Sequence, residues 1–230
     1  MTDMTTILDN DTADANTPVW VAIPPGYVPL PLTEATERLD QARTMLTEVA
    51  EVDQRALIDA VTGALSALLS QLDATGALYC GIGRHTAPDD SIVTSSLVVS
   101  YLEFEGTRNP RLVLSDLVHA KADAGQHAQV DIIDVAERPM LFLERTRQLP
   151  TPHLPGQPEL PDDATSPVFQ LEAHIPSDAG DKLATIEFST PHESQGPQFR
   201  AMVLAMASSL SFEPPAVSDD VSTKFEQVLG

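Results

Sequence analysis

Positive charge is scarce in this sequence. Thirteen Lys and Arg residues stand against thirty-four Asp and Glu, and 13 − 34 gives a formal net charge of −21. Such a surface repels phosphate groups, which argues against general binding to nucleic acid and against adhesion to anionic lipid. The charge instead favours a basic protein as the partner.

Cysteine and long apolar runs are also nearly missing. The one cysteine, Cys80, excludes an internal disulfide framework and fits a reducing cytoplasm. No stretch reaches the roughly 18 uninterrupted apolar residues of a membrane-spanning helix. Residues 1–16 contain neither Lys nor Arg nor an apolar run, so we expect no signal peptide and a cytoplasmic location.

Hydrophobic residues make up 42% of the chain, enough for a sizeable core. We expect a disordered acidic tail over 1–17, a single α+β domain over 18–213, and a tail or docking helix over 214–230. Alternation over 19–23 predicts a short strand. Apolar residues at three- and four-residue steps over 33–74 predict two amphipathic helices, or one helix kinked near 52–53.

The period changes to two after residue 76. Alternating or β-branched segments predict strands at 77–82, 92–104, 130–135, 140–143, 168–175 and 183–188. Asn109-Pro110 opens a short helix and Pro197 opens a final one, whereas the six prolines of 149–167 predict a long exposed loop without strand or helix. Since short links join the strands, the fold class is α+β: a central, largely antiparallel sheet flanked by amphipathic helices.

The succession of segments in the second half is similar to a known pattern. The segments 130–135, 169–175 and 183–191, which ends in Phe188-Ser189-Thr190-Pro191, precede a terminal helix ending at Ser208-Ser209-Leu210-Ser211-Phe212. Over roughly residues 77–212 this order resembles small actinobacterial proteins of the PsbP-like superfamily. The resemblance implies an antiparallel sheet flanked by helices and a role in binding or assembly, and it carries over no catalytic residue. Ten Arg against three Lys also fit a GC-rich actinobacterial source.

Motifs that carry chemistry are missing. The sequence has no GxSxG elbow, no HExxH and no zinc-finger spacing, so we assign no catalytic, cofactor-binding or metal-binding residue and expect no cofactor. Cys80 lies in an apolar strand, which predicts a buried and inert thiol. Arg138, Arg145 and Arg147 are expected to pair with Glu137 and Glu144 on one face of a sheet.

Six residues are candidates for contact with a ligand or partner: His85, Asp89, Glu172, His174, Trp20 and Tyr27. His174 is either a general base or, as we favour from the strand alternation, a solvent-facing residue. Trp20 and Tyr27 either anchor the first strand by burial, which we favour, or form an exposed aromatic patch.

These observations favour a non-enzymatic protein-binding module: an adaptor, a secretion- or injection-system assembly factor, a chaperone or an immunity-type protein. Its acidic surface would engage a basic partner. The alternative is an enzyme or small-ligand binder with a pocket between sheet and helices, which would use His85 or His174 with Asp89 or Glu172. A homo-oligomer formed through the apolar helix Leu57–Leu72 also stays open.

Overall fold

Seven strands form one sheet in which every neighbouring pair is antiparallel. The computed structural model describes residues 5–6, 18–52, 54–87, 89–123, 129–135, 138–151, 155, 161 and 163–214. The elements are β1 (Thr5–Thr6), β2 (Ala22–Ile23), β3 (Tyr27–Pro29), α1 (Ala35–Val49), α2 (Arg55–Ala74), β4 (Ala77–Thr86), β5 (Ile92–Glu103), α3 (Pro110–Asp123), β6 (Gln129–Val135), β7 (Arg138–Pro150), β8 (Thr165–Pro176), β9 (Lys182–Thr190), the 3₁₀ helix η1 (Glu193–Phe199) and α4 (Arg200–Ser209). The predicted α+β class with an antiparallel sheet flanked by helices is confirmed.

The strand order β3-β4-β5-β9-β8-β7-β6 places the long-range pair β5–β9 at the centre of the sheet. In β8 alternate residues, Phe169, Leu171, Ala173 and Ile175, belong to the main hydrophobic core. The residues between them point to the opposite face, because successive side chains of a strand alternate. The sequence of each strand therefore determines which side chains lie on which face of the sheet, and different helices pack on the two faces.

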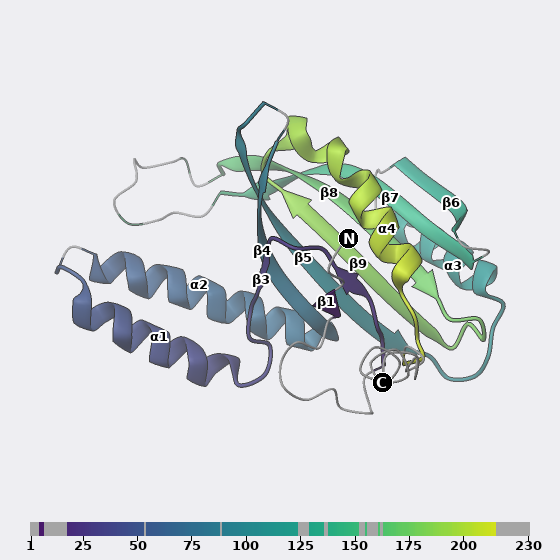
Figure 1. Ribbon diagram of the computed structural model, residues 1–230, viewed down its shortest axis with the longest axis horizontal. Coiled ribbons are helices and arrows are strands. Elements are labelled where there is room, and N and C mark those ends of the chain that lie inside the picture. The colour runs from purple at the N-terminus through teal and green to yellow at the C-terminus, as the bar shows by residue number, and fades with distance from the viewer. Residues whose placement is uncertain are drawn as a thin grey trace, which may run out of the picture.

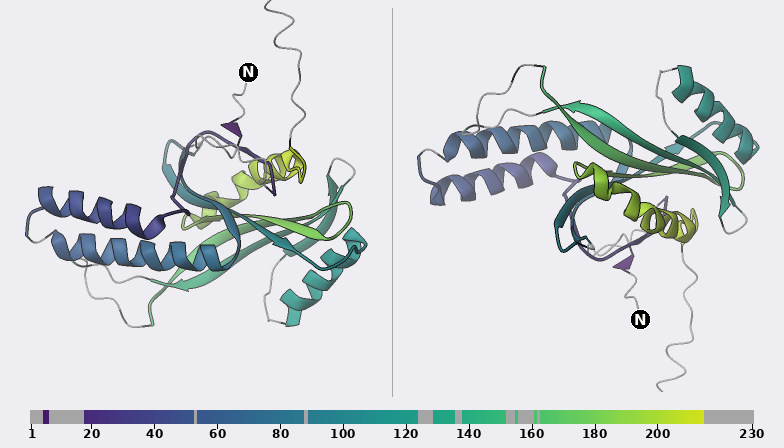
Figure 2. Two further views of the ribbon diagram at one scale, coloured as in Figure 1. Left: turned by 90° about the horizontal axis from the view of Figure 1, so that it is seen from below. Right: turned by 90° about the horizontal axis from the view of Figure 1, so that it is seen from above.

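Helix α4 and residues 18–23 lie over one face of the sheet, and α3 lies over the other (Figures 1 and 2). The first face holds the main core, in which Phe188 and Phe199 stack with ring centroids 4.7 Å apart. The second face holds a smaller apolar cluster in which Leu114 of α3 meets Leu141 and Leu143 of β7. Helices thus pack on both faces, with α3 over β7 and β8 on the second face, although an antiparallel sheet can leave one face to solvent.

Helices α1 and α2 form an antiparallel hairpin, the arm, which projects beyond the β3–β4 edge of the sheet (Figure 1). This settles the prediction for 33–74 in favour of two helices. The chain passes from α2 into β4 through Gly76, whose φ is +71°, and a Cβ at Gly76 would lie 2.6 Å from the carbonyl oxygen of Tyr101. Glycine is required there because a side chain would fit neither the left-handed backbone nor the space.

Several predicted boundaries differ from the structure. β4 continues to Thr86, beyond the predicted strand end at residue 82, and Thr5–Thr6, inside the expected tail, pair with β2. The expected proline-rich loop 149–167 is strand at both ends, since β7 continues to Pro150 and β8 begins at Thr165. The final helix starts as η1 at Glu193, before Pro197. Residues 215–230 of the expected tail or docking helix over 214–230, and residues 1–4 and 7–17 of the expected acidic tail, lie outside the described residues.

Candidate functional site

Two of the predicted residues, Glu172 and His174, lie in contact on the α3 face of β8. Histidine Nε2 and the carboxylate Oε2 are 3.0 Å apart. The Lys121 ammonium, from the last turn of α3, donates to the same carboxylate at 2.6 Å, and the Arg145 guanidinium of β7 donates to the other oxygen. Arg145 also donates to Gln170 at 3.1 Å. We call Lys121, Arg145, Gln170, Glu172 and His174 the buried ion cluster.

Burial and charge pairing fix the protonation of the buried ion cluster. Burial alone would raise the pKa of Glu172, but hydrogen bonds from His174 and Lys121 and the positive charge of Lys121 lower it to about 2. Burial lowers the pKa of His174, and it raises that of Glu187 nearby, to which the charge of Glu172 adds. The cluster is therefore a carboxylate held between two cations beside a neutral imidazole.

This arrangement leaves little scope for acid–base chemistry. Both ring nitrogens of His174 are engaged, Nε2 with Glu172 and Nδ1 with Thr185 at 2.9 Å. A carboxylate with a pKa near 2 is a weak base at neutral pH. The cluster instead ties α3 to β7 and β8, which is a structural role.

Two predictions about this face were wrong. His174 is 5% exposed and faces α3, so it is not the solvent-facing residue that we favoured. Arg145 pairs with Glu172 and not with Glu144, whose carboxylate instead accepts from Arg200. Arg138 donates to the carbonyl oxygen of Ser208 at 3.4 Å, on the α4 face, because positions 138 and 145 of β7 point to opposite faces. The other expected partner, Glu137, lies outside the described residues.

His85 belongs to a second polar group at the β3–β5 end of the sheet. Its Nε2 lies 2.8 Å from Ser95 Oγ, and that hydroxyl donates to Tyr27 Oη at 3.2 Å. The histidine ring also packs against Tyr27 and Phe199, each with a centroid distance of 5.1 Å. Gly83 leaves room for this packing, since a Cβ there would come within 2.7 Å of Ser95 Oγ and Tyr27 Cε1.

Burial lowers the pKa of His85 and raises the pKa of Tyr27 to about 12. Both groups are thus neutral at physiological pH. Ser95 was not among the sequence candidates, and the alternation of β5, which turns Val93, Ser95 and Leu97 to the core face, is the signal that could have found it.

The last two candidates, Asp89 and Trp20, lie apart from both histidines. Asp89 accepts hydrogen bonds from Ser91 and, at 3.2 Å, from Gln195 Nε2, so it closes a loop rather than pairing with His85. Trp20 is partly buried and forms an isolated bridge to Ser211, and its Nε1 is buried without a partner among the described residues. The favoured burial of Tyr27 and Trp20 is confirmed in part, since both are half-buried.

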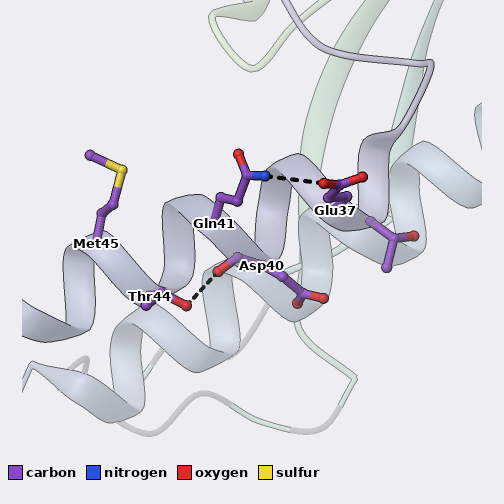
Figure 3. Close-up of a pocket in the computed structure, with 6 residues that line it drawn as sticks. Glu37, Asp40, Gln41, Thr44 and Met45 are labelled. Carbon is purple, nitrogen blue, oxygen red and sulfur yellow. Dashed lines mark hydrogen bonds between the residues drawn. The ribbon is translucent and has the colours of Figure 1, made fainter.

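Most side chains of the arm are exposed or only partly buried. Helix α1 buries only Leu39 and α2 buries only Leu69. The outer side of α1 forms an open groove lined by Thr36, Glu37, Asp40, Gln41, Thr44 and Met45 (Figure 3). A second groove runs between the helices and is lined by Asp40, Arg43, Thr44, Thr47, Glu48, Arg55 and Asp59.

The charges of the arm are unbalanced on α1. Arg38 pairs with Glu34 at 3.7 Å, and Arg43 pairs with Asp59 at 2.8 Å. Within the described part of the chain, no ion pair reaches the exposed carboxylates of Glu37, Asp40 and Glu48. We call Glu37, Asp40 and Glu48 the acidic face of α1. It is a surface of uncompensated negative charge on a projecting element.

The length and composition of α2 are those of a helix that could cross a membrane, and a single such helix is weak evidence for a span. Among the described residues, no group of three or more His, Cys, Asp or Glu side chains is placed to hold a metal ion. No family model and no curated protein matches the chain.

Proposed function

We propose that the protein is a non-enzymatic protein-binding module, an adaptor or assembly factor that engages a basic partner through its acidic surface. Assembly in a secretion or injection system, chaperoning and immunity-type inhibition are the roles that fit such a module. The acidic face of α1 on the projecting arm is the observation that carries the proposal. The PsbP-like resemblance, with its binding and assembly roles, points in the same direction.

The position of the acidic face suits the capture of a partner. It lies on an element that extends past the sheet (Figure 1), and its three carboxylates border the two grooves of the arm. The one hydrogen bond within the outer groove that reaches a carboxylate is from Gln41 Nε2 to Glu37, at 3.3 Å (Figure 3). Lysine or arginine side chains of a partner could therefore bind without displacing an internal ion pair.

The remaining charge of the molecule adds to this effect. At least seven of the thirteen basic side chains already form ion pairs within the chain. The excess of acidic groups is therefore displayed outward. Such a field accelerates the approach of a basic protein and weakens as salt is added, because the Debye length falls to about 3 Å at 1 M.

The proposal is tested by parallel affinity capture from an extract of the source cells. The baits are the full chain and a variant with Glu37→Gln, Asp40→Asn and Glu48→Gln, which keeps size and hydrogen-bonding capacity. We expect a basic protein that the wild type retains at low salt, releases near 1 M salt, and that the variant does not retain. Equal capture by both baits, or capture of acidic proteins alone, contradicts the proposal.

A second variant controls for the loss of charge as such. Asp123→Asn, Asp131→Asn and Asp178→Asn remove three exposed carboxylates that lie outside the arm and form no ion pair among the described residues. If the acidic face of α1 is the binding surface, this control variant retains the captured protein. Circular dichroism verifies that all three baits are folded.

A further inference from the structure

One flank of the arm is apolar and uncovered. The exposed fractions are 69% for Met45 and 83% for Val49 in α1, and 38% for Leu57, 45% for Val61 and 43% for Leu68 in α2. We call these five residues the apolar flank. Clustered exposure of this kind marks an interaction surface, whereas single exposed apolar residues are ordinary.

The helical spacing shows that the α2 residues form one stripe. Leu57, Val61, Ala64 and Leu68 follow at steps of four, three and four, so at 100° per residue they lie within about 60° of arc. A neighbouring stripe with the same spacing is at least half-buried and contains Ile58, Thr62, Leu65 and Leu69. Thus α2 carries two parallel seams, and only one of them is packed among the residues that the structure describes.

The Arg43–Asp59 ion pair identifies the flanks of the arm. Arg43 of α1 and Asp59 of α2 contact each other, so they lie on the same flank of this antiparallel hairpin. The Leu57 stripe is on the side of α2 that is turned away from Asp59, so it lies on the opposite flank. On α1, Met45 and Val49 are turned by about 160° and 120° from Arg43, which places them on the same flank as that stripe. The two helices therefore share one flank that holds the Leu57 stripe, Met45 and Val49. Arg38 of α1 also lies on this flank, within about 20° of Met45, and Met45 borders the outer groove beside Glu37 and Asp40.

We propose that the apolar flank binds the apolar flank of a second copy of this chain, so that two arms form an antiparallel four-helix bundle. The stripe spacing of four, three and four is the spacing with which helices interdigitate in such bundles. From Leu57 to Leu72 the stripe contains no Asp, Glu, Lys or Arg. A highly charged partner would find no opposite charge on this stripe, whereas two copies bring two uncharged α2 stripes together. On the α1 part of the flank, Arg38 is paired with Glu34 within its own chain.

The dimensions of the arm are sufficient. A 20-residue helix is about 30 Å long and about 10 Å wide, so two adjacent helices offer roughly 500 Å² per chain and about 1,000 Å² in a dimer. This is near the lower limit for a specific interface, which predicts a dimer that dissociates on dilution. The arm projects past the edge of the sheet, and Leu68, near the inner end of the flank, is still 43% exposed, so the flank is accessible along its length (Figures 1 and 2).

Sedimentation equilibrium of the full chain over a range of concentrations tests the proposal. We expect a shift from 24.7 kDa toward twice that mass as concentration rises. In a symmetric dimer, Val61→Glu introduces one carboxylate from each copy into the apolar interface. We expect it to raise the dimer dissociation constant at least about tenfold. Ser70→Glu adds the same charge to an exposed position of α2 away from the stripe and leaves the dimer unchanged.

Disulfide trapping locates the contact independently. Ala64→Cys lies near the middle of the stripe and forms a cross-linked dimer under mild oxidation, whereas Ser70→Cys stays monomeric, and the native Cys80 is buried. A monomer at every concentration, or a dimer that Val61→Glu does not weaken, overturns the proposal. It is also overturned if the chain stays monomeric and binds lipid vesicles in a Val61-dependent manner. These results are independent of capture by the acidic face, since neither Val61→Glu nor Ala64→Cys alters that face.

Discussion

Replacement of Glu172 by Gln tests the energetics of the buried ion cluster. The side chain of Glu172 is 4% exposed and holds Lys121 and Arg145 at its two oxygens. Gln keeps the shape and removes the charge, so two cations lose their counter-ion in a buried site. Breaking such a pair typically costs about 3–5 kcal/mol.

The lowered pKa gives an independent magnitude. A folded-state pKa of about 2 against an ordinary value of 4.5 corresponds to about 3 kcal/mol of stability, at 1.36 kcal/mol per pKa unit. Since the pKa is depressed in the folded state, this stability is present above pH 4.5 and is lost as the pH falls toward 2. We expect the free energy of unfolding of Glu172→Gln to be about 3 kcal/mol lower than that of the wild type at pH 7. At pH 3 this difference, the stability gap, should be roughly 2 kcal/mol smaller.

Urea unfolding followed by far-ultraviolet circular dichroism at pH 7, 5, 4 and 3 measures this gap. His174 and Glu187 titrate in both proteins, with opposite signs: the lowered pKa of His174 costs stability below pH 6.5, and the raised pKa of Glu187 costs stability as the pH rises. Because the charge of Glu172 helps to raise both pKa values, Glu172→Gln lowers them both, and these two smaller changes oppose the narrowing of the difference at low pH. A gap that is the same at pH 7 and pH 3, or no gap at pH 7, refutes the reasoning.

Three further predictions concern packing and reactivity. Gly180→Ala destabilises the fold by at least about 1 kcal/mol in urea unfolding, because φ is +66° and a Cβ would collide with the Arg108 carbonyl oxygen; an unchanged midpoint contradicts the turn geometry. Leu114→Ala lowers the free energy of unfolding by about 2–5 kcal/mol. Leu112→Ala, on the same helix but at a 60% exposed position, lowers it by less than about 1 kcal/mol. Equal decreases would show that α3 is not packed on β7 through Leu114. Burial raises the pKa of the Cys80 thiol to about 11, so Ellman's reagent should react with it at pH 8 only after unfolding, and rapid labelling of the folded chain would disprove its burial.

Local periodicity was enough to predict the sheet and the helices. Alternation over 168–175 and 183–188 identified β8 and β9, and the spacing over 57–72 identified α2, because each pattern records which side chains face a core. Strand ends were less certain. Pro150 and Pro167 argued against a strand, yet both lie in strands. β8 pairs with β9 only from Phe169 onward, so at Pro167 there is no second neighbouring strand that would need a backbone N–H from this residue.

The environment of the candidate residues depended on long-range contacts that local patterns do not contain. Alternation placed His174 opposite Ala173, as the structure shows, but it carried no signal that α3 would cover that face. The register that sets Leu143 against Glu172 brings Arg145 within reach of this carboxylate, and a register between strands 30 residues apart cannot be read from either strand alone. The apolar helix was recognised from sequence, whereas its exposure became visible only once the arm was seen to project from the sheet.

Amide hydrogen exchange of the full chain, with and without the captured basic protein, tests the binding proposal most directly. We expect exchange to slow over residues 37–48, the span of the acidic face of α1, and β6 and β7 to exchange as before. We also expect the protection to disappear near 1 M salt and in the variant with Glu37→Gln, Asp40→Asn and Glu48→Gln. Protection confined to other elements, with α1 unchanged by the partner, would contradict the claim that this face is the binding surface.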